Sequence, residues 1–327
     1  MIEGLPTGYA ARNYRGAVDH AALATISTAD AAADGVDEVV SVEDIDAHYA
    51  HLNNCDPDRD IFIVDHDGES VAYGRTEWRD VIGEHRAYFA LLRTAGEHRH
   101  LYAPMLSWLE TRIGEIASSH EDASEKKIEI WAVEAPAGPK VGLAPLLEER
   151  GYTRVTYGAS MVRPDLEDIP DAALPAGLEV RAVEPDHLRT IWEADREAFR
   201  DHWGESEWTE ENWKWFLEFP YRDESLWKIA WDGDEVAGQV KSFIDREENE
   251  AFGRERGWTE FISTGRKWRR QGVARALICE SLRELKDRGM TEAALGVHVE
   301  NPNGAYHLYE SLGFSIVHRF GTYHKDI

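Results

Sequence analysis

The chain has 327 residues, with 36 Lys plus Arg against 62 Asp plus Glu and a formal net charge of −26 at pH 7. This charge repels nucleic-acid phosphates and anionic lipids, so the composition argues against both as partners. A hydrophobic content of 43%, with 12 Trp, 12 Tyr and 10 Phe, supplies apolar area for packed cores and excludes a disordered chain. At about 150 residues per domain, the length predicts two domains.

Targeting and redox features are few. The sequence has no uninterrupted apolar run of membrane-spanning length, and its first residues lack the basic-then-apolar build of a signal peptide. Cys55 and Cys279 match no metal-ligand or redox spacing. We therefore expect a cytoplasmic protein without a membrane partner, a disulfide framework or a zinc site.

The two halves of the chain resemble each other in four segments that occur in the same order at a nearly constant separation. The pairs are Leu5–Arg12 with Leu174–Arg181, Asp67–Gly68 with Asp232–Gly233, Val133–Pro136 with Val299–Pro302, and Glu148–Tyr152 with Glu310–Phe314. Such a repeat indicates two homologous domains. Pro164, Pro170 and Pro175 interrupt the acidic stretch between them. We predict an N-terminal domain over residues 1–163, a linker over 164–176 and a C-terminal domain over 177–327.

In the C-terminal half, a strand over 178–183 is followed by a helix over 186–199, which Pro185 opens. Thr209 is the expected N-cap of a second helix over 209–219. Strands over 226–231 and 235–244 form a hairpin about Asp232–Gly233. An acidic loop over 245–250 then leads to a strand over 258–264.

The next segment, from Gly272, has a helical apolar face and ends at Gly289, and a strand over 293–299 follows it. A strand–helix–strand crossover places ligands at the carboxyl ends of the strands, near the start of the helix. Glycine at that start exposes backbone N–H groups to a phosphate. Five basic residues surround it: Arg266, Lys267, Arg269, Arg270 and Arg275. A solvated basic surface is the alternative interpretation.

Arg269–Ala274, RRQGVA, resembles the acetyl-CoA signature of the GNAT acetyltransferases, and Asn301–Phe314 resembles the family's closing block. The resemblance implies two tandem GNAT-like α/β (α+β) domains, each with a mixed central sheet flanked by helices. It implies acetyl-CoA as cosubstrate without a metal. Asn301 lies one residue further from Tyr309 than the family spacing, so either Asn301 or Asn303 takes the asparagine's role. The implied acetyl-CoA-binding residues are Ser263, Thr264, Gly265, Arg266, Arg269, Arg270, Gln271, Gly272, Val273, Ala274, Arg275, Asn301, Asn303 and Tyr309.

Acetyl transfer to an amine needs a base, a carbonyl-polarising donor and a proton for the leaving thiolate. The resemblance implies Glu260 as the base, Tyr309 as the acid, and a backbone N–H between Ser263 and Gly265 as the donor. The alternatives are a surface glutamate and a tyrosine packed in the core. His202 and Trp203 are candidates for acceptor binding, with helix capping or packing as the alternative.

The N-terminal copy lacks the corresponding groups. Tyr102 replaces Gly272 and Pro104 replaces Ala274, which closes the phosphate site. On the repeat alignment, Ala135, Leu147 and Ala90 stand where Asn301, Tyr309 and Glu260 stand. His98 and His100 are too few for a metal site.

We therefore predict an N-acetyltransferase that uses a ternary complex and acts on a small-molecule or peptide amine. One alternative is a sensor that binds acetyl-CoA without turnover. Another is the activity of the mycothiol synthases, tandem GNAT proteins that the domain arrangement resembles. The sequence does not determine the oligomeric state, and a homodimer is one alternative.

Overall fold

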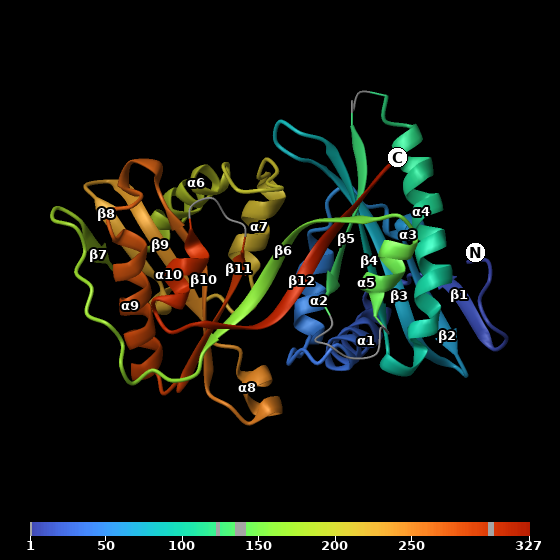
Figure 1. The fold of residues 1–327 in the computed structure, drawn as a ribbon, viewed down its shortest axis with the longest axis horizontal. Helices are drawn as coiled ribbons and strands as arrows, with labels where there is room; N and C mark the ends of the chain where they lie inside the picture. The colour runs from blue at the N-terminus through green and yellow to red at the C-terminus, as the bar shows by residue number, and fades with distance from the viewer. Residues whose placement is uncertain (1, 122–124, 135–141, 300–303) are drawn as a thin grey trace. The chain divides into compact units, whose positions relative to one another are not determined.

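A computed structural model describes residues 2–121, 125–134, 142–299 and 304–327. The chain forms two compact units (Figure 1). Unit 1 contains Met1–Tyr157 and Arg319–Ile327, and unit 2 contains Gly158–His318. Among the described residues, no helix has the length and apolar character needed to cross a membrane.

Unit 1 follows the order β1 Tyr9–Asn13, α1 His20–Ala33, α2 Val42–Ala50, α3 Pro57–Asp60, β2 Ile61–His66, β3 Glu69–Asp80, β4 Arg86–Thr94, α4 Tyr102–Ser118, β5 Lys126–Val133, α5 Leu143–Glu149 and the first part of β6 Thr153–Arg163. Unit 2 continues with β7 Glu179–Arg181, α6 Leu188–Phe199, α7 Glu210–Glu218, β8 Lys228–Asp232, β9 Glu235–Phe243, α8 Arg246–Phe252, β10 Arg256–Thr264, α9 Val273–Asp287, β11 Glu292–His298, α10 Ala305–Glu310 and the first part of β12 Ser315–Asp326.

Each unit contains a mixed sheet. The strand order is β1-β2-β3-β4-β5-β12 in unit 1 and β7-β8-β9-β10-β11-β6 in unit 2. The pairs β4–β5 and β10–β11 are parallel, and the other pairs described within each unit are antiparallel. This confirms the predicted class of two mixed sheets with flanking helices.

Helices cover both faces of the unit 2 sheet. On one face, the Ser242 hydroxyl of β9 hydrogen-bonds to that of Ser281 in α9. On the other, the Gln239 side chain donates to the carbonyl of Ile191 in α6 at 3.1 Å. Because these two β9 residues differ by an odd number of positions, their side chains leave opposite faces of the strand. The sheet is therefore enclosed between α6 and α9.

The units exchange the last strand of each copy. The segment 158–163 of β6 pairs with β11 in unit 2, and residues 320–326 of β12 pair with β5 in unit 1. The unit boundaries therefore differ from the expected ranges 1–163 and 177–327. The expected linker, 164–176, packs on unit 2, where Leu166 is buried in the core.

Two helix starts in unit 2 have the residues that the sequence predicts for them. Thr209 caps α7 in a reciprocal capping box, and Pro185 begins a short turn that runs directly into α6. One prediction is wrong, because the acidic segment after β9 forms the helix α8 instead of a loop. Asp245 caps this helix by accepting a hydrogen bond from the Glu248 N–H at 2.9 Å. Carboxylates in the first turn then suit the helix dipole.

Candidate active site

The strand β10 is irregular at the position predicted for the catalytic base. Its antiparallel register with β9 shifts between Glu260 and Ser263, and Phe261 has a left-handed φ of 49°. A side-chain-bearing residue in that region costs about 1–2 kcal/mol. Such a bulge bends the strand and redirects its side chains, and it is frequent beside active sites.

The same point marks a gap between β10 and β11. Their parallel register ends at Trp258 opposite Ala294, and further along the Glu260 carboxylate reaches β11 instead. Its Oε1 accepts the Gly296 N–H at 2.6 Å. A Cβ at position 296 would lie 3.3 Å from that oxygen, so glycine permits the close approach. The sequence contained no signal for this divergence of the strands.

Burial raises the pKa of Glu260 to about 7, although backbone N–H groups of Gly296 and Phe261 hydrogen-bond to the carboxylate and oppose the increase. A carboxyl group with that pKa is about half ionised at neutral pH, which is the range that suits a general base. The alternative interpretation, a surface glutamate on an edge strand, does not describe this side chain, because β10 lies between β9 and β11.

Tyr309 of α10 lies within electrostatic reach of Glu260. Burial and, secondarily, the Glu260 charge raise its pKa, so the phenol stays protonated at neutral pH. Its ring is 6% exposed and packs in the unit 2 core with Phe314. The hydroxyl makes no hydrogen bond to the described residues, which leaves it available as a donor. The residue therefore packs in the core and keeps a protonated hydroxyl that can act as a donor.

The start of α9 is open. Gly272 is the N-cap residue with φ of 90°, and no side chain caps the helix. A Cβ at Gly272 would meet no atom within 4 Å. Glycine is therefore favoured here by the positive φ and not by crowding, and the space in front of the helix is open. The first-turn N–H groups, including those of Val273 and Ala274, have no intrahelical acceptors and are therefore available to an anion.

Most of the basic residues near this start are held by the protein itself. Arg266 and Arg269 both donate to Asp201, at 2.8 Å and 3.0 Å, and hydrogen bonds from Arg266, then Arg269, lower the pKa of Asp201 to about 2. Lys267 pairs with Glu235. The positive charge expected here is therefore largely neutralised.

Three further residues of the predicted set have local roles. Arg275 donates to the Ser311 hydroxyl at 2.8 Å, and the Gln271 side chain donates to the carbonyl of Lys267 at 2.7 Å. Arg270 is exposed with φ of 61° and makes no hydrogen bond or ion pair to the described residues. Among the described residues, it is the arginine of this segment most free to meet an anion.

The backbone N–H groups expected near the thioester carbonyl differ in whether another part of the protein already pairs with them. The Gly265 N–H already donates to the Ala237 carbonyl at 3.0 Å. Ser263 and Thr264 lie in register with β9, opposite Gln239 and Gly238. Phe261 and Ile262, inside the bulge, have no register partner in β9. Asn301 and Asn303 lie outside the described residues.

His202 and Trp203 follow α6 and contact the end of β11. The Trp203 ring stacks on His298 with centroids 5.6 Å apart, and His202 lies 5.5 Å from the same ring. Burial lowers the pKa of His202. Sequence analysis missed His298, although its position two residues after Gly296 places it beside the gap.

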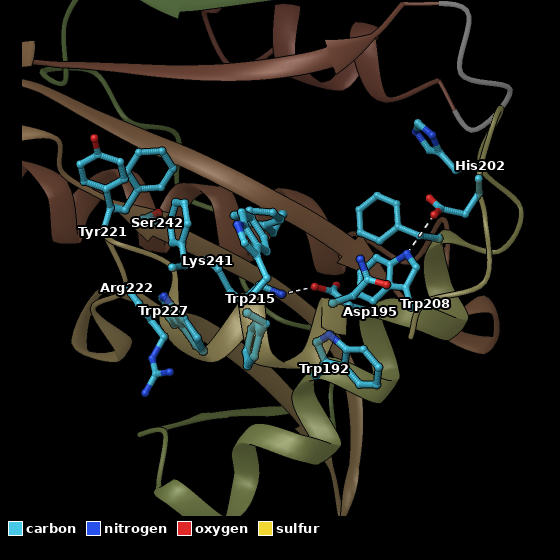
Figure 2. A pocket seen from close by; sticks show the side chains of 17 residues that line it. Trp192, Asp195, His202, Trp208, Trp215, Tyr221, Arg222, Trp227, Lys241 and Ser242 are labelled. Atoms are coloured by element: carbon cyan, nitrogen blue, oxygen red, sulfur yellow. Dashed lines mark hydrogen bonds and ion pairs between the residues drawn. The ribbon is translucent and has the colours of Figure 1, made fainter. Parts of the chain in front are cut away.

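A cavity of about 380 Å³ opens between the α6–α7 segment and the strands β9 and β10 (Figure 2). His202 lines it, together with a set of aromatic side chains that sequence analysis treated only as core material. These are Trp192, Phe199, Trp208, Trp215, Phe216, Phe219, Tyr221, Trp227, Phe243 and Phe261. The signal available in the sequence was the density of aromatic residues between positions 199 and 227.

A buried ion pair joins the cavity wall to the bulge. Asp195 of α6 accepts from Lys241 of β9 and, at 2.6 Å, from the Ser263 hydroxyl of β10. Figure 2 shows Lys241 and Asp195 facing each other across the cavity wall. Burial raises the pKa of Asp195, and the Lys241 charge opposes that increase. The network connects three elements at the edge of the gap.

Unit 1 has a different arrangement at the equivalent positions. Tyr102 begins α4 and its hydroxyl donates to Asp30 at 2.6 Å, while Arg99 donates to Asp34 at 2.6 Å. Ala90 lies in an uninterrupted β3–β4 ladder, and Leu147 is fully buried in the core. Ala135 lies outside the described residues. The described part of the chain contains no cluster of three or more side chains suited to a metal.

Comparison with known proteins agrees with this geometry. Residues 188–314 match the model of the Acetyltransferase (GNAT) family. A mycothiol acetyltransferase from Geodermatophilus obscurus is 26% identical over 263 residues, which cover 79% of each protein. The enzyme is therefore an acyltransferase that moves an acetyl group to an amine. Residues 188–314, within unit 2, therefore form an acetyltransferase domain of the GNAT family.

Two solved structures share the whole fold. A GCN5-related N-acetyltransferase from Sphaerobacter thermophilus has a TM-score of 0.72 at 24% identity and covers 98% of this chain and 96% of its own. A tandem GNAT protein from the clavulanic acid biosynthesis pathway has a TM-score of 0.61 at 15% identity, with coverage of 97% and 98%. At these identities the likeness establishes the fold alone.

Proposed function

We propose that unit 2 binds acetyl-CoA at the start of α9 and transfers its acetyl group directly to an amine in a ternary complex. The observation that carries the proposal is the Glu260 carboxylate in the gap between β10 and β11, with a pKa of about 7 and Tyr309 nearby. A base and an acid with well-separated pKa values suit a reaction that removes one proton and delivers another.

The residues at the start of α9 fit the cosubstrate. The open space at Gly272 lets a pyrophosphate approach the uncapped N–H groups, as helix starts bind anions elsewhere. Arg270 is free to add a charge-assisted hydrogen bond. Acetyl-CoA supplies an activated acetyl thioester when bound.

Each proton has a place in this scheme. Glu260 accepts the proton that the amine nitrogen loses as it bonds to the acetyl carbon. Tyr309 donates its proton to the sulfur as the carbon–sulfur bond breaks. Glu260 then releases its proton to solvent, and solvent returns a proton to the phenolate. A backbone N–H of the bulge polarises the acetyl carbonyl. The products are the N-acetylated amine and the CoA thiol.

We propose that unit 1 does not bind acetyl-CoA. At the start of α4, Tyr102 stands where unit 2 has Gly272, and its hydroxyl is bonded to Asp30. Pro104 removes an N–H from the first turn of the helix. The predicted domains, 1–163 and 177–327, remain a proposal about ancestry, whereas the folded units share strands as described above.

Release of the CoA thiol from acetyl-CoA, measured with a panel of amines, tests the proposal. An enzyme releases thiol only when an acceptor is present, and Glu260→Gln slows the release without loss of acetyl-CoA binding. A sensor without turnover would bind acetyl-CoA, and replacement of Glu260 or Tyr309 would have no effect on its function. Mycothiol-related amines belong in the panel, because a relative is named mycothiol acetyltransferase.

A further inference from the structure

Aromatic side chains form most of the wall of the cavity beside the gap. Ten of its 17 lining residues are Trp, Phe or Tyr. At about 380 Å³ it lies at the lower end of the range of roughly 300–1,000 Å³ for ligand pockets. A compact apolar ligand therefore fits its size and its walls.

The polar side chains in the wall are already engaged inside the protein. Asp195 holds Lys241 and Ser263, and the Glu205 carboxylate accepts the indole N–H of Trp208 at 2.9 Å. Four other polar side chains in the wall also have partners in the protein: the Asn212 side-chain oxygen accepts from Thr209, Arg222 donates to Glu224, Ser242 bonds to Ser281, and His202 bonds to the Trp203 backbone. Hydroxyl groups of a sugar buried here would find few partners, and buried polar groups without partners are costly.

The cavity adjoins the catalytic carboxylate. Phe261, which lines the cavity, directly follows Glu260 in the chain, and Lys241, also in the wall, is the register partner of Glu260 in β9. The faces of Phe261 and Phe216 lie 5.3 Å and 5.5 Å from the Lys241 ammonium. These two rings therefore already contact one ammonium group at the cavity wall, and aromatic walls of this kind suit an apolar ligand that carries an amine.

Resting on the proposed function, we propose that the acceptor is a small primary amine with an aromatic or similarly apolar body, of the arylalkylamine type. The body lies among the aromatic rings, and the amine points toward Glu260. The Lys241 charge does not repel an incoming ammonium strongly, because Asp195 neutralises it in a buried pair. An amino sugar would have to bury its hydroxyls against mostly aromatic walls, so we expect it to be a poor acceptor.

The test measures CoA-thiol release from acetyl-CoA with 2-phenylethylamine, tryptamine and glucosamine, together with calorimetric binding of each amine to the full chain in the presence of CoA. The expected kcat/KM for the two aromatic amines exceeds that for glucosamine at least 100-fold, and only the aromatic amines bind. Glucosamine preferred over both, or acetyl-CoA bound without binding of an aromatic amine, would overturn the inference and leave the proposed function standing. Failure to bind acetyl-CoA at all would instead overturn the proposed function.

Two variants of one helix locate the binding. Trp215 of α7 lines the cavity, whereas Trp213 of the same helix lies outside its wall. Trp215→Ala should raise KM for 2-phenylethylamine at least 10-fold and leave KM for acetyl-CoA unchanged. Trp213→Ala, the matched control, should change both values by less than about threefold. Equal effects of the two variants on the amine would place the acceptor elsewhere.

Discussion

Replacement of Glu260 by glutamine removes an ionisable group while keeping an oxygen that accepts the Gly296 N–H. The pKa of Glu260 is about 7 in place of its ordinary 4.5, so the folded chain favours the protonated form. The stability that the folded chain gains from binding this proton more tightly than the unfolded chain is therefore complete below pH 4.5 and is lost as pH rises through 7. At about 1.4 kcal/mol for each pH unit between the two values, the total is about 3 kcal/mol.

Glu260→Gln should thus become more stable than the wild type as pH rises. From pH 5 to pH 8 the difference in the free energy of unfolding between the two proteins should grow by about 2–3 kcal/mol, measured by urea denaturation at each pH. The variant should also lose about 10²–10⁴-fold in kcat, the usual contribution of a general base. The wild-type kcat should increase with pH around a midpoint near 7, and the variant should lack that midpoint.

Glu250→Gln, at an exposed glutamate of α8, is the matched control and should change neither property. A stability difference that stays constant from pH 5 to pH 8, or a midpoint near 7 that persists in Glu260→Gln, would refute the reasoning. The first result would mean that the carboxyl is not buried as described. The second would mean that another group controls the reaction.

Three other substitutions test separate parts of the site. Tyr309→Phe should lower kcat about 100-fold and leave the acetyl-CoA Kd unchanged by calorimetry, and a weakened Kd would argue against a role confined to proton donation. Gly272→Val should cost about 1–2 kcal/mol of stability and abolish acetyl-CoA binding, while Gly253→Val, at another open glycine with φ of 61°, should cost similar stability and retain binding. Arg270→Ala should weaken acetyl-CoA binding about 10-fold or more, as loss of a charged hydrogen bond does. Arg266→Ala should weaken it less. The reverse order would show that the ion pairs of Arg266 break when acetyl-CoA binds.

The parts of the fold that the sequence predicted depend on local chemistry. Asp232–Gly233 forms the hairpin between β8 and β9, and Thr209 caps α7. Helix α9 ends before Gly289, which has φ of 89°, as a left-handed residue after a helix requires. Each of these features is determined within a few residues, so a single sequence is sufficient to predict it.

The parts that the sequence missed depend on long-range pairing. Asp201 neutralises Arg266 and Arg269 from a different element, so the run of basic residues overstated the free positive charge. The bulge at Phe261 and the Glu260–Gly296 contact need three neighbouring strands in place. The strand exchange needs both units, and it means that halves cut between residues 163 and 175 would each lose a strand of their sheet.

The central claim is that one of the two copies binds acetyl-CoA. Calorimetric titration of the intact chain with acetyl-CoA tests it most directly, with Gly272→Val measured alongside. The account predicts one site per chain in the wild type and none in the variant. Two sites in the wild type, or one that persists in Gly272→Val, would show that unit 1 binds the cosubstrate and would contradict the account.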